Sequence, residues 1–203
     1  MQKVLSNDFF ALIIPICMKV RDIAFIAIAT ALMCILAPIS VPIGIVPITL
    51  GTLALYLIGA ILGPVKATIA IILYILLGLA GLPVFSGFKS GAAVLTGPTG
   101  GFIVGYIPAV FAQSLFTSKF STRKSAYVFG ILFGTVIIYG FGVAWFLLMV
   151  KGKYTFEQAM AACVYPFLIG DSVKLILAVS IGYKLRPLFE RITDTSKYRK
   201  VGR

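Results

Sequence analysis

Long apolar runs, separated by short segments that carry prolines, glycines and charges, make up most of this 203-residue chain. A membrane-spanning helix needs about 20 mostly apolar residues. The pattern predicts an all-α membrane protein, with six spans at about residues 21–37, 49–62, 67–82, 101–116, 126–149 and 159–183. One more apolar stretch, residues 9–18, is too short to span, and we expect it to lie at the membrane interface.

The first predicted outer loop is unusually apolar. It contains Pro38, Pro42 and Pro47, and three prolines so close together cannot continue a helix, because each lacks an amide hydrogen. A solvated loop would be rich in polar turn residues. We therefore expect this loop to fold back over the bundle as a lid, although a kinked continuation of the first span is an open alternative.

The second predicted outer loop, residues 83–100, combines four glycines with Phe85, Phe88 and Lys89. Glycine lets a backbone approach a ligand closely, and its amides can serve as donors. Pro98 suits the opening turn of the next span, whose free amides would favour a carboxylate nearby. A flexible surface loop without a ligand is the alternative interpretation.

Asp171 and Lys174 lie inside the last apolar run. A charge at the centre of a membrane helix costs about 2.5 to 3.5 kcal/mol, so such residues are rare unless they have a use. Their spacing of three places both side chains on one helix face, where they can neutralise each other and offer an acceptor and a donor to a polar solute. An ion pair that only aids helix packing is the alternative.

Composition agrees with a membrane protein. The chain is 60% hydrophobic and 12% charged, with a mean hydropathy of +1.07. We expect a single membrane domain over residues 1–203, with a cytoplasmic or interfacial segment at 1–19 and a basic cytoplasmic tail at 184–203.

The net charge is +12, and the basic residues are distributed unequally between the two sides of the membrane. In the six-span arrangement three basic residues lie outside and one lies in the membrane, and the other fourteen share the side of the amino terminus. This asymmetry predicts cytoplasmic termini, and nucleic acid is not needed to explain the basicity. The fourteen are Lys3, Lys19, Arg21, Lys66, Lys119, Arg123, Lys124, Lys184, Arg186, Arg191, Lys197, Arg199, Lys200 and Arg203.

The sequence contains few residues that could carry out enzymatic catalysis. The chain has no histidine, and Cys17, Cys34 and Cys163 lack metal-binding spacing. We find no phosphate-binding GxxxxGK[ST] loop and no carboxylate cluster for magnesium, and we expect no metal and no cofactor. Acid–base catalysis by a lone Asp and Lys remains a weaker alternative to binding.

Small residues recur at a spacing of four in the first span, at Ala27 and Ala31. Small side chains let another helix approach closely. They form a candidate docking face for a partner, with packing inside the same bundle as the alternative.

Four segments, taken together and in order, resemble one known family. They are VPITLGTL (46–53), GLAGLPVFSGF (78–88), GPTGGFIVGY (97–106) and YPFLIGDSVKLILA (165–178). They resemble the biotin-specific S component of energy-coupling-factor (ECF) transporters, the BioY family, over about residues 20–185. The chain departs from the family pattern at Gly51, where Gln is frequent, and at Ile169, where Pro is frequent.

The resemblance implies a six-helix vitamin-binding subunit in the prokaryotic plasma membrane, with an outward pocket closed by outer loops. It implies as partners a transmembrane coupling protein, docked at Ala27 and Ala31, and two ABC-type ATPases that supply ATP hydrolysis. The substrate-binding residues that it implies are Asp171, Lys174, Ser86, Lys89, Phe85, Phe88, Thr99 and Gly100.

Biotin joins a cyclic urea to a carboxylate through an apolar bicycle and an aliphatic arm. We expect Asp171 to accept from the urea N–H groups and Lys174 to donate to the urea oxygen. Phe85, Phe88 and residues 43–47 would enclose the ring, and Lys89 or the amides near Thr99 and Gly100 would meet the tail carboxylate. An S component for riboflavin or thiamine, or a scaffold subunit without a ligand, are the alternatives.

Overall fold

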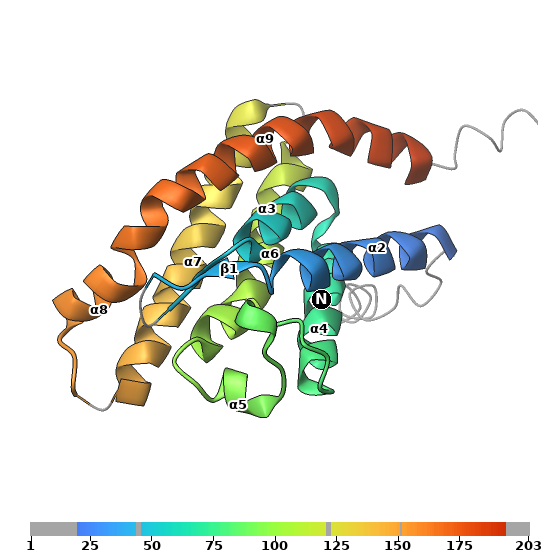
Figure 1. Ribbon diagram of the computed structural model, residues 1–203. Coiled ribbons are helices and arrows are strands. Elements are labelled where there is room, and N and C mark those ends of the chain that lie inside the picture. Colours follow the sequence, from blue (N-terminus) through green and yellow to red (C-terminus); the bar gives the residue numbers. More distant parts are fainter. Residues whose placement is uncertain (1–19, 44–45, 121–122, 151, 194–203) are drawn as a thin grey trace, which may run out of the picture.

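The computed structural model describes residues 20–43, 46–120, 123–150 and 152–193. The predicted interfacial stretch 9–18, Cys17 and the end of the basic tail lie outside these residues. The described part is mainly helical, with one two-stranded hairpin (Figure 1). Its elements are α2 (Val20–Leu36), β1 (Ser40–Val41), β2 (Ile48–Thr49), α3 (Gly51–Ile61), α4 (Pro64–Leu79), η1 (Ser86–Phe88), α5 (Ala92–Leu95), α6 (Gly100–Lys119), α7 (Lys124–Val150), α8 (Phe156–Cys163) and α9 (Tyr165–Thr193).

Five of the six predicted spans each coincide with one helix of the described residues, and the sixth coincides with two, α8 and α9. Within the described residues, three stretches are long and apolar enough to cross a membrane: α6, α7, and Phe156–Ile192, which joins α8 to α9. The apolar helices α3 and α4 are shorter, with 11 and 16 residues. At a rise of about 1.5 Å per residue, α3 is only about 16 Å long, so its ends need partners inside the protein.

The apolar loop after α2 is a hairpin and not a kinked continuation of the helix. Helix α2 ends at Leu36, and β1 pairs with β2 in antiparallel register, Ser40 opposite Thr49 and Val41 opposite Ile48. The structure therefore contradicts the alternative of a kinked helix, and the role of the loop as a lid stays a prediction. The hairpin leads directly into α3, which places Thr49 beside the first turn of that helix.

Helices α6 and α7 pack with their backbones close together. A Cβ on Gly101 would overlap the side chain of Trp145, and one on Gly142 would overlap the ring of Phe102. In a membrane, where burying apolar surface from lipid gains little, such close packing is what holds two helices together. The pair forms one wall of the bundle (Figure 1).

The last predicted span, residues 159–183, is wrong at both ends. A break at Val164 separates α8 from α9. The break lies just before Pro166, because a proline inside a continuous helix would lack the amide hydrogen for the i−4 carbonyl, whereas in the first turn of a new helix it is accommodated. The amino end of α8 is closed by a capping box between Thr155 and Gln158, so this helix begins at Phe156, within the predicted loop.

Helix α9 also continues to Thr193, ten residues into the predicted tail. The extension packs on other helices through Arg186 and Phe189, which are both buried. The ring of Phe189 meets that of Phe25 of α2 with centroids 4.6 Å apart, and Arg21 donates to the backbone carbonyl of Ile192 at 2.6 Å. These tertiary contacts explain a helix that polar composition alone did not predict.

The carboxyl end of α3 is capped by side chains from α6 and α9. The last carbonyls of a helix have no partner within it. Here the carbonyl of Gly59 in the last turn accepts from Thr117 of α6 at 2.9 Å, and one turn earlier the carbonyl of Tyr56 also accepts from Gln113 of α6 at 2.7 Å. Arg186 of α9 donates to the Ala60 carbonyl at 3.2 Å, which also places a positive charge at the negative end of the helix dipole.

Replacing Arg186 by Met should destabilise the bundle. Arg186 is 5% exposed and also donates to Ser118 of α6 at 3.0 Å. The substitution removes the donor to the buried Ala60 carbonyl and to the partly buried Ser118 hydroxyl, and we expect a loss of about 2 kcal/mol in the free energy of unfolding. Thermal unfolding of the detergent-solubilised protein measures this loss. Lys184→Met, at an exposed position of the same helix, is the control, and equal melting points for the two variants would contradict the capping role.

Candidate functional site

A cavity of about 660 Å³ lies between α3, α4, α6, α7 and α9 and is bordered by the hairpin and the loop that follows α4. This volume is within the range of small-molecule pockets, about 300 to 1,000 Å³. Asp171 and Lys174 of α9 both line it. The predicted charged pair therefore borders an open space and is not confined to a helix–helix contact.

Asp171 and Lys174 form a buried ion pair. Nζ of Lys174 lies 2.8 Å from Oδ1 of Asp171, and each residue is only 6% exposed. This confirms the expectation that the two neutralise each other. Two opposite charges beside a cavity supply a donor and an acceptor to any polar ligand that enters it.

The ammonium group of Lys174 is fully engaged in hydrogen bonds. Besides Asp171, it donates to the backbone carbonyl of Thr49 at 2.7 Å and to Oγ1 of Thr52 at 2.9 Å. An ammonium has three protons, so a ligand acceptor must displace one of these partners. The hydroxyl of Thr52 is the most easily displaced, because it lies on a side chain that can rotate.

The carboxylate of Asp171 is held on both oxygens. Thr52 donates to Oδ1 at 3.1 Å, and the Tyr139 hydroxyl of α7 donates to Oδ2 at 2.7 Å. Thr52 is in the first turn of α3, whose positive dipole end favours a negative charge nearby. The acid is therefore positioned by three elements, the helices α9, α7 and α3.

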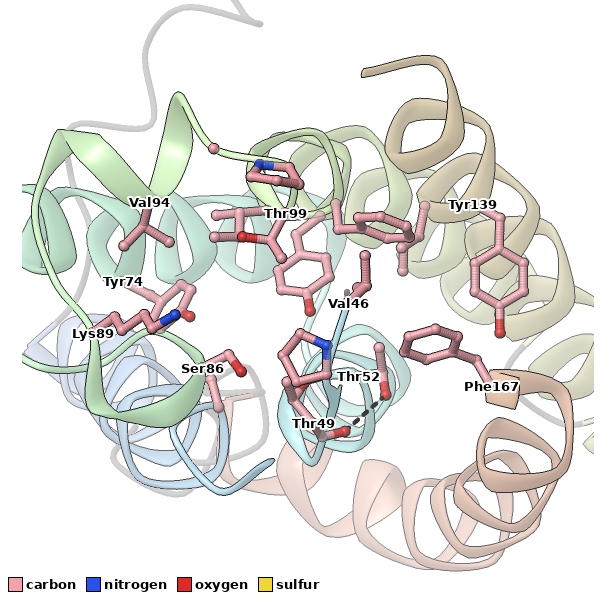
Figure 2. Close-up of a pocket in the computed structure, with 18 of the residues that line it drawn as sticks. Val46, Thr49, Thr52, Tyr74, Ser86, Lys89, Val94, Thr99, Tyr139 and Phe167 are labelled. Atoms are coloured by element: carbon pink, nitrogen blue, oxygen red, sulfur yellow. Dashed lines mark hydrogen bonds between the residues drawn. The ribbon is translucent and has the colours of Figure 1, made fainter. Parts of the chain in front are cut away.

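The opposite side of the cavity carries a second set of polar groups. Figure 2 shows Lys89 and Ser86 on one side and Tyr139 and Phe167 on the other. Lys89, Phe88 and Thr99 line the cavity, and Phe88 and Lys89 are exposed. Oγ of Ser86 is buried and, among the described residues, finds no hydrogen-bond partner. A hydroxyl in this situation can bind a ligand atom.

Two of the predicted site residues are not brought into the cavity wall. Phe85 is fully buried behind the wall, with its ring edge-on to Tyr74 at 5.7 Å between centroids. Gly100 opens α6, and its amide donates to the carbonyl of Gly97 at 3.1 Å. The structure therefore does not place the Phe85 ring against a ligand, and it does not leave the Gly100 amide free for a carboxylate.

Phe85 anchors the second loop. Its ring lies over Gly78 of α4, where a Cβ would overlap it, and the amide of Gly91 donates to the carbonyl of the same Gly78 at 2.8 Å. Farther along, the indole N–H of Trp145 donates to the carbonyl of Gly97 at 3.0 Å. The loop that carries Ser86, Phe88 and Lys89 is thus fixed at both ends.

Sequence reasoning missed several residues of the wall. Thr49, Thr52, Tyr74, Tyr106 and Tyr139 bring hydroxyl groups to the cavity, and Phe102 and Phe167 stack with centroids 6.5 Å apart. A signal existed for the tyrosines, because a hydroxyl in the middle of an apolar span needs a buried partner. Which of them share a cavity follows only from the packing.

Two further predictions have a place in the structure. Ala27 and Ala31 both lie exposed on α2, one helical turn apart. In the described part of the chain, no group of three or more His, Cys, Asp or Glu residues could hold a metal ion.

Comparison with known proteins finds relatives that match most of the chain. The model of the BioY family matches residues 6–191. A probable biotin transporter BioY of Pyrococcus horikoshii is 37% identical over 83% of this chain and 98% of its own length. The biotin transporter BioY of Thermotoga maritima is also 37% identical, over 83% of this chain and 97% of its own.

The fold is similar to that of a solved protein, described as the S-component for biotin from an ECF-type ABC transporter. The TM-score is 0.76 and the sequence identity 29%, with 83% of this chain and 92% of the solved chain covered.

Gly78→Ala should loosen the second loop. The added methyl group requires the buried Phe85 ring to move, and we expect a loss of about 1 to 3 kcal/mol in the free energy of unfolding. The melting temperature in detergent measures it. Gly140→Ala is the control, because a Cβ there meets nothing within 4 Å and alanine favours a helix. A melting point for Gly78→Ala equal to that of the control would contradict the anchoring role of Phe85.

Proposed function

The chain belongs to the BioY family, and on this premise we propose that it is the biotin-binding S component of an ECF-type transporter. It is a transporter subunit and not an enzyme. The observation that supports this function most directly is the buried pair of Asp171 and Lys174 at the wall of a cavity of about 660 Å³.

Biotin fits the two sides of this cavity. Its cyclic urea has N–H donors and a carbonyl acceptor, which complement Asp171 and Lys174. Its carboxylate, at the end of an aliphatic arm, would reach Lys89 and the unpartnered hydroxyl of Ser86 on the other side. Phe102 and Phe167 supply apolar surface in the same wall for the bicyclic ring.

We assign the closing of the site to the two loops. Val46 and Pro47 of the hairpin segment and Phe88 of the second loop line the cavity, so both loops can cover a bound ligand. The second loop is anchored by Phe85 and Trp145, and the hairpin segment is held by the bond from Lys174 to the carbonyl of Thr49.

The proposed membrane arrangement has six spans: α2, α3, α4, α6, α7 and the joined α8–α9. Both termini are cytoplasmic, because this orientation places most of the basic residues inside. The cavity then opens to the outer side of the plasma membrane. The shortness of α3 suits this arrangement, since the proline-containing loop before it occupies part of the membrane depth.

The proposed partners are a transmembrane coupling protein and two ABC-type ATPases. The chain has no GxxxxGK[ST] motif of its own, so uphill uptake through such a complex needs nucleotide hydrolysis from other chains. The exposed face of α2 at Ala27 and Ala31 is the proposed contact with the coupling protein. The cavity beside the ion pair does not favour a scaffold without a ligand.

Asp171→Asn and Lys174→Met should each weaken biotin binding. The first removes the charge that accepts from the urea, and the second removes the ammonium donor; we expect at least about a tenfold rise in Kd for each. Titration calorimetry in detergent measures this change. Asp22→Asn, which breaks the ion pair of Asp22 with Lys66 away from the cavity, is the control. Unchanged affinity in both site variants would refute the assignment of the urea group.

Ala31→Leu should leave biotin binding intact and disrupt assembly. A leucine on this exposed face keeps two helices from approaching closely, and we expect most of the coupling protein to be lost when the complex is purified through a tag on this subunit. Ile28→Leu, on a neighbouring exposed position, is the matched control. Equal recovery of the coupling protein with both variants would show that this face of α2 is not the contact.

A further inference from the structure

The carboxylate of Asp171 has one acceptor position left. An ionised carboxylate offers about four acceptor positions, two on each oxygen. Oδ1 accepts from Lys174 at 2.8 Å and from Thr52 at 3.1 Å, so both of its positions are occupied. Oδ2 accepts from Tyr139 at 2.7 Å, and among the described residues that is its one hydrogen bond. A ligand donor can therefore be accepted at Oδ2 without displacing a protein group.

Tyr139 orients the free acceptor position of Oδ2 toward the cavity. It comes from α7, opposite the helix that carries Asp171, and its side chain lines the cavity beside Phe167 (Figure 2). Its hydroxyl donates a hydrogen bond to Oδ2, and this bond fixes the rotation of the carboxylate group about the Cβ–Cγ bond. Without that bond, Oδ2 could turn toward the ammonium of Lys174, which already holds Oδ1, and the free acceptor position would be withdrawn from the ligand.

We propose that Tyr139 is a positioning residue that makes Asp171 selective for a ligand N–H group. This inference rests on the function proposed above and adds a specificity to it. Because the tyrosine proton already binds Oδ2, the carboxylate and the Tyr139 hydroxyl together offer the ligand an acceptor and no donor. If a ligand carried an oxygen in place of this N–H group, its oxygen and the carboxylate would both be acceptors, with no proton between them. A site built around hydrogen bonds rejects such a ligand strongly.

The test compares three proteins with three ligands. The proteins are the wild type, Tyr139→Phe and Tyr56→Phe. Tyr56 is the matched control: it is a buried tyrosine whose hydroxyl is 2.7 Å from that of Thr135, and it does not line the cavity. The ligands are biotin and the two cyclic carbamates in which one or the other urea N–H is replaced by an ether oxygen. Affinities are measured by calorimetry in detergent.

We expect Tyr139→Phe to bind biotin about tenfold more weakly than the wild type, since a hydrogen bond to a charged group is lost. Tyr56→Phe should stay within about twofold of the wild type, because the hydroxyl of Tyr56 bonds Thr135 and not the carboxylate of Asp171. The wild type should discriminate against one of the carbamates by about tenfold or more. In Tyr139→Phe this discrimination should shrink, because the acceptor that recognises the N–H is no longer held in place.

Other results overturn the inference. If Tyr139→Phe weakens biotin and both carbamates by one common factor, the hydroxyl has only a structural role. If the wild type binds both carbamates as tightly as biotin, no N–H is recognised, and this result stands even if Tyr139→Phe cannot be purified. A wild type that binds no biotin at all would instead refute the proposed function, so the two failures are distinguishable.

Discussion

Two oppositely charged side chains of α9 hold α3 near its two ends. Asp171 accepts from Thr52 in the first turn of α3, and Arg186 donates to the carbonyl of Ala60 in its last turn. Each charge has the sign that the helix dipole favours at that end. This arrangement matters because α3 has only 11 residues and cannot satisfy its terminal groups with water inside a membrane. It also fixes the hairpin residue Thr49, whose carbonyl binds Lys174.

The cavity exists because the surrounding contacts are tight. Glycines let α6 and α7 meet closely, and the ring of Phe85 fills the space above Gly78. With these walls fixed, the groups that face the open space keep their positions: Asp171 is bound through Tyr139 and Thr52, and Lys174 through Thr49. A site in which donors and acceptors are already oriented loses less entropy when a ligand binds, which suits the binding function proposed for this chain.

Local patterns predicted the elements well and their ends less well. The apolar runs located α2, α3, α4, α6 and α7 and the joined stretch of α8 and α9, because a helix is the structure that satisfies the backbone of an apolar segment internally. The errors concern α9, where the break at Val164 and the extension to Thr193 differ from the predicted span. The extension has polar residues at half its positions, and it is helical because Arg186 and Phe189 find partners on other helices. Such partners are distant in the sequence and leave no local signal.

The sequence by itself determined the class of protein, the acidic and basic pair and the family, because charges in an apolar run and several spaced motifs are visible without a structure. It also predicted which loop carries Ser86, Phe88 and Lys89. Only the tertiary structure decided that Phe85 anchors this loop behind the wall, that the Gly100 amide is already bound, and that Tyr139 reaches Asp171 from another helix. The physical reason is that hydrogen bonds and ring contacts between helices depend on the distances at which the helices pack. Residue type and spacing along one helix do not determine these distances.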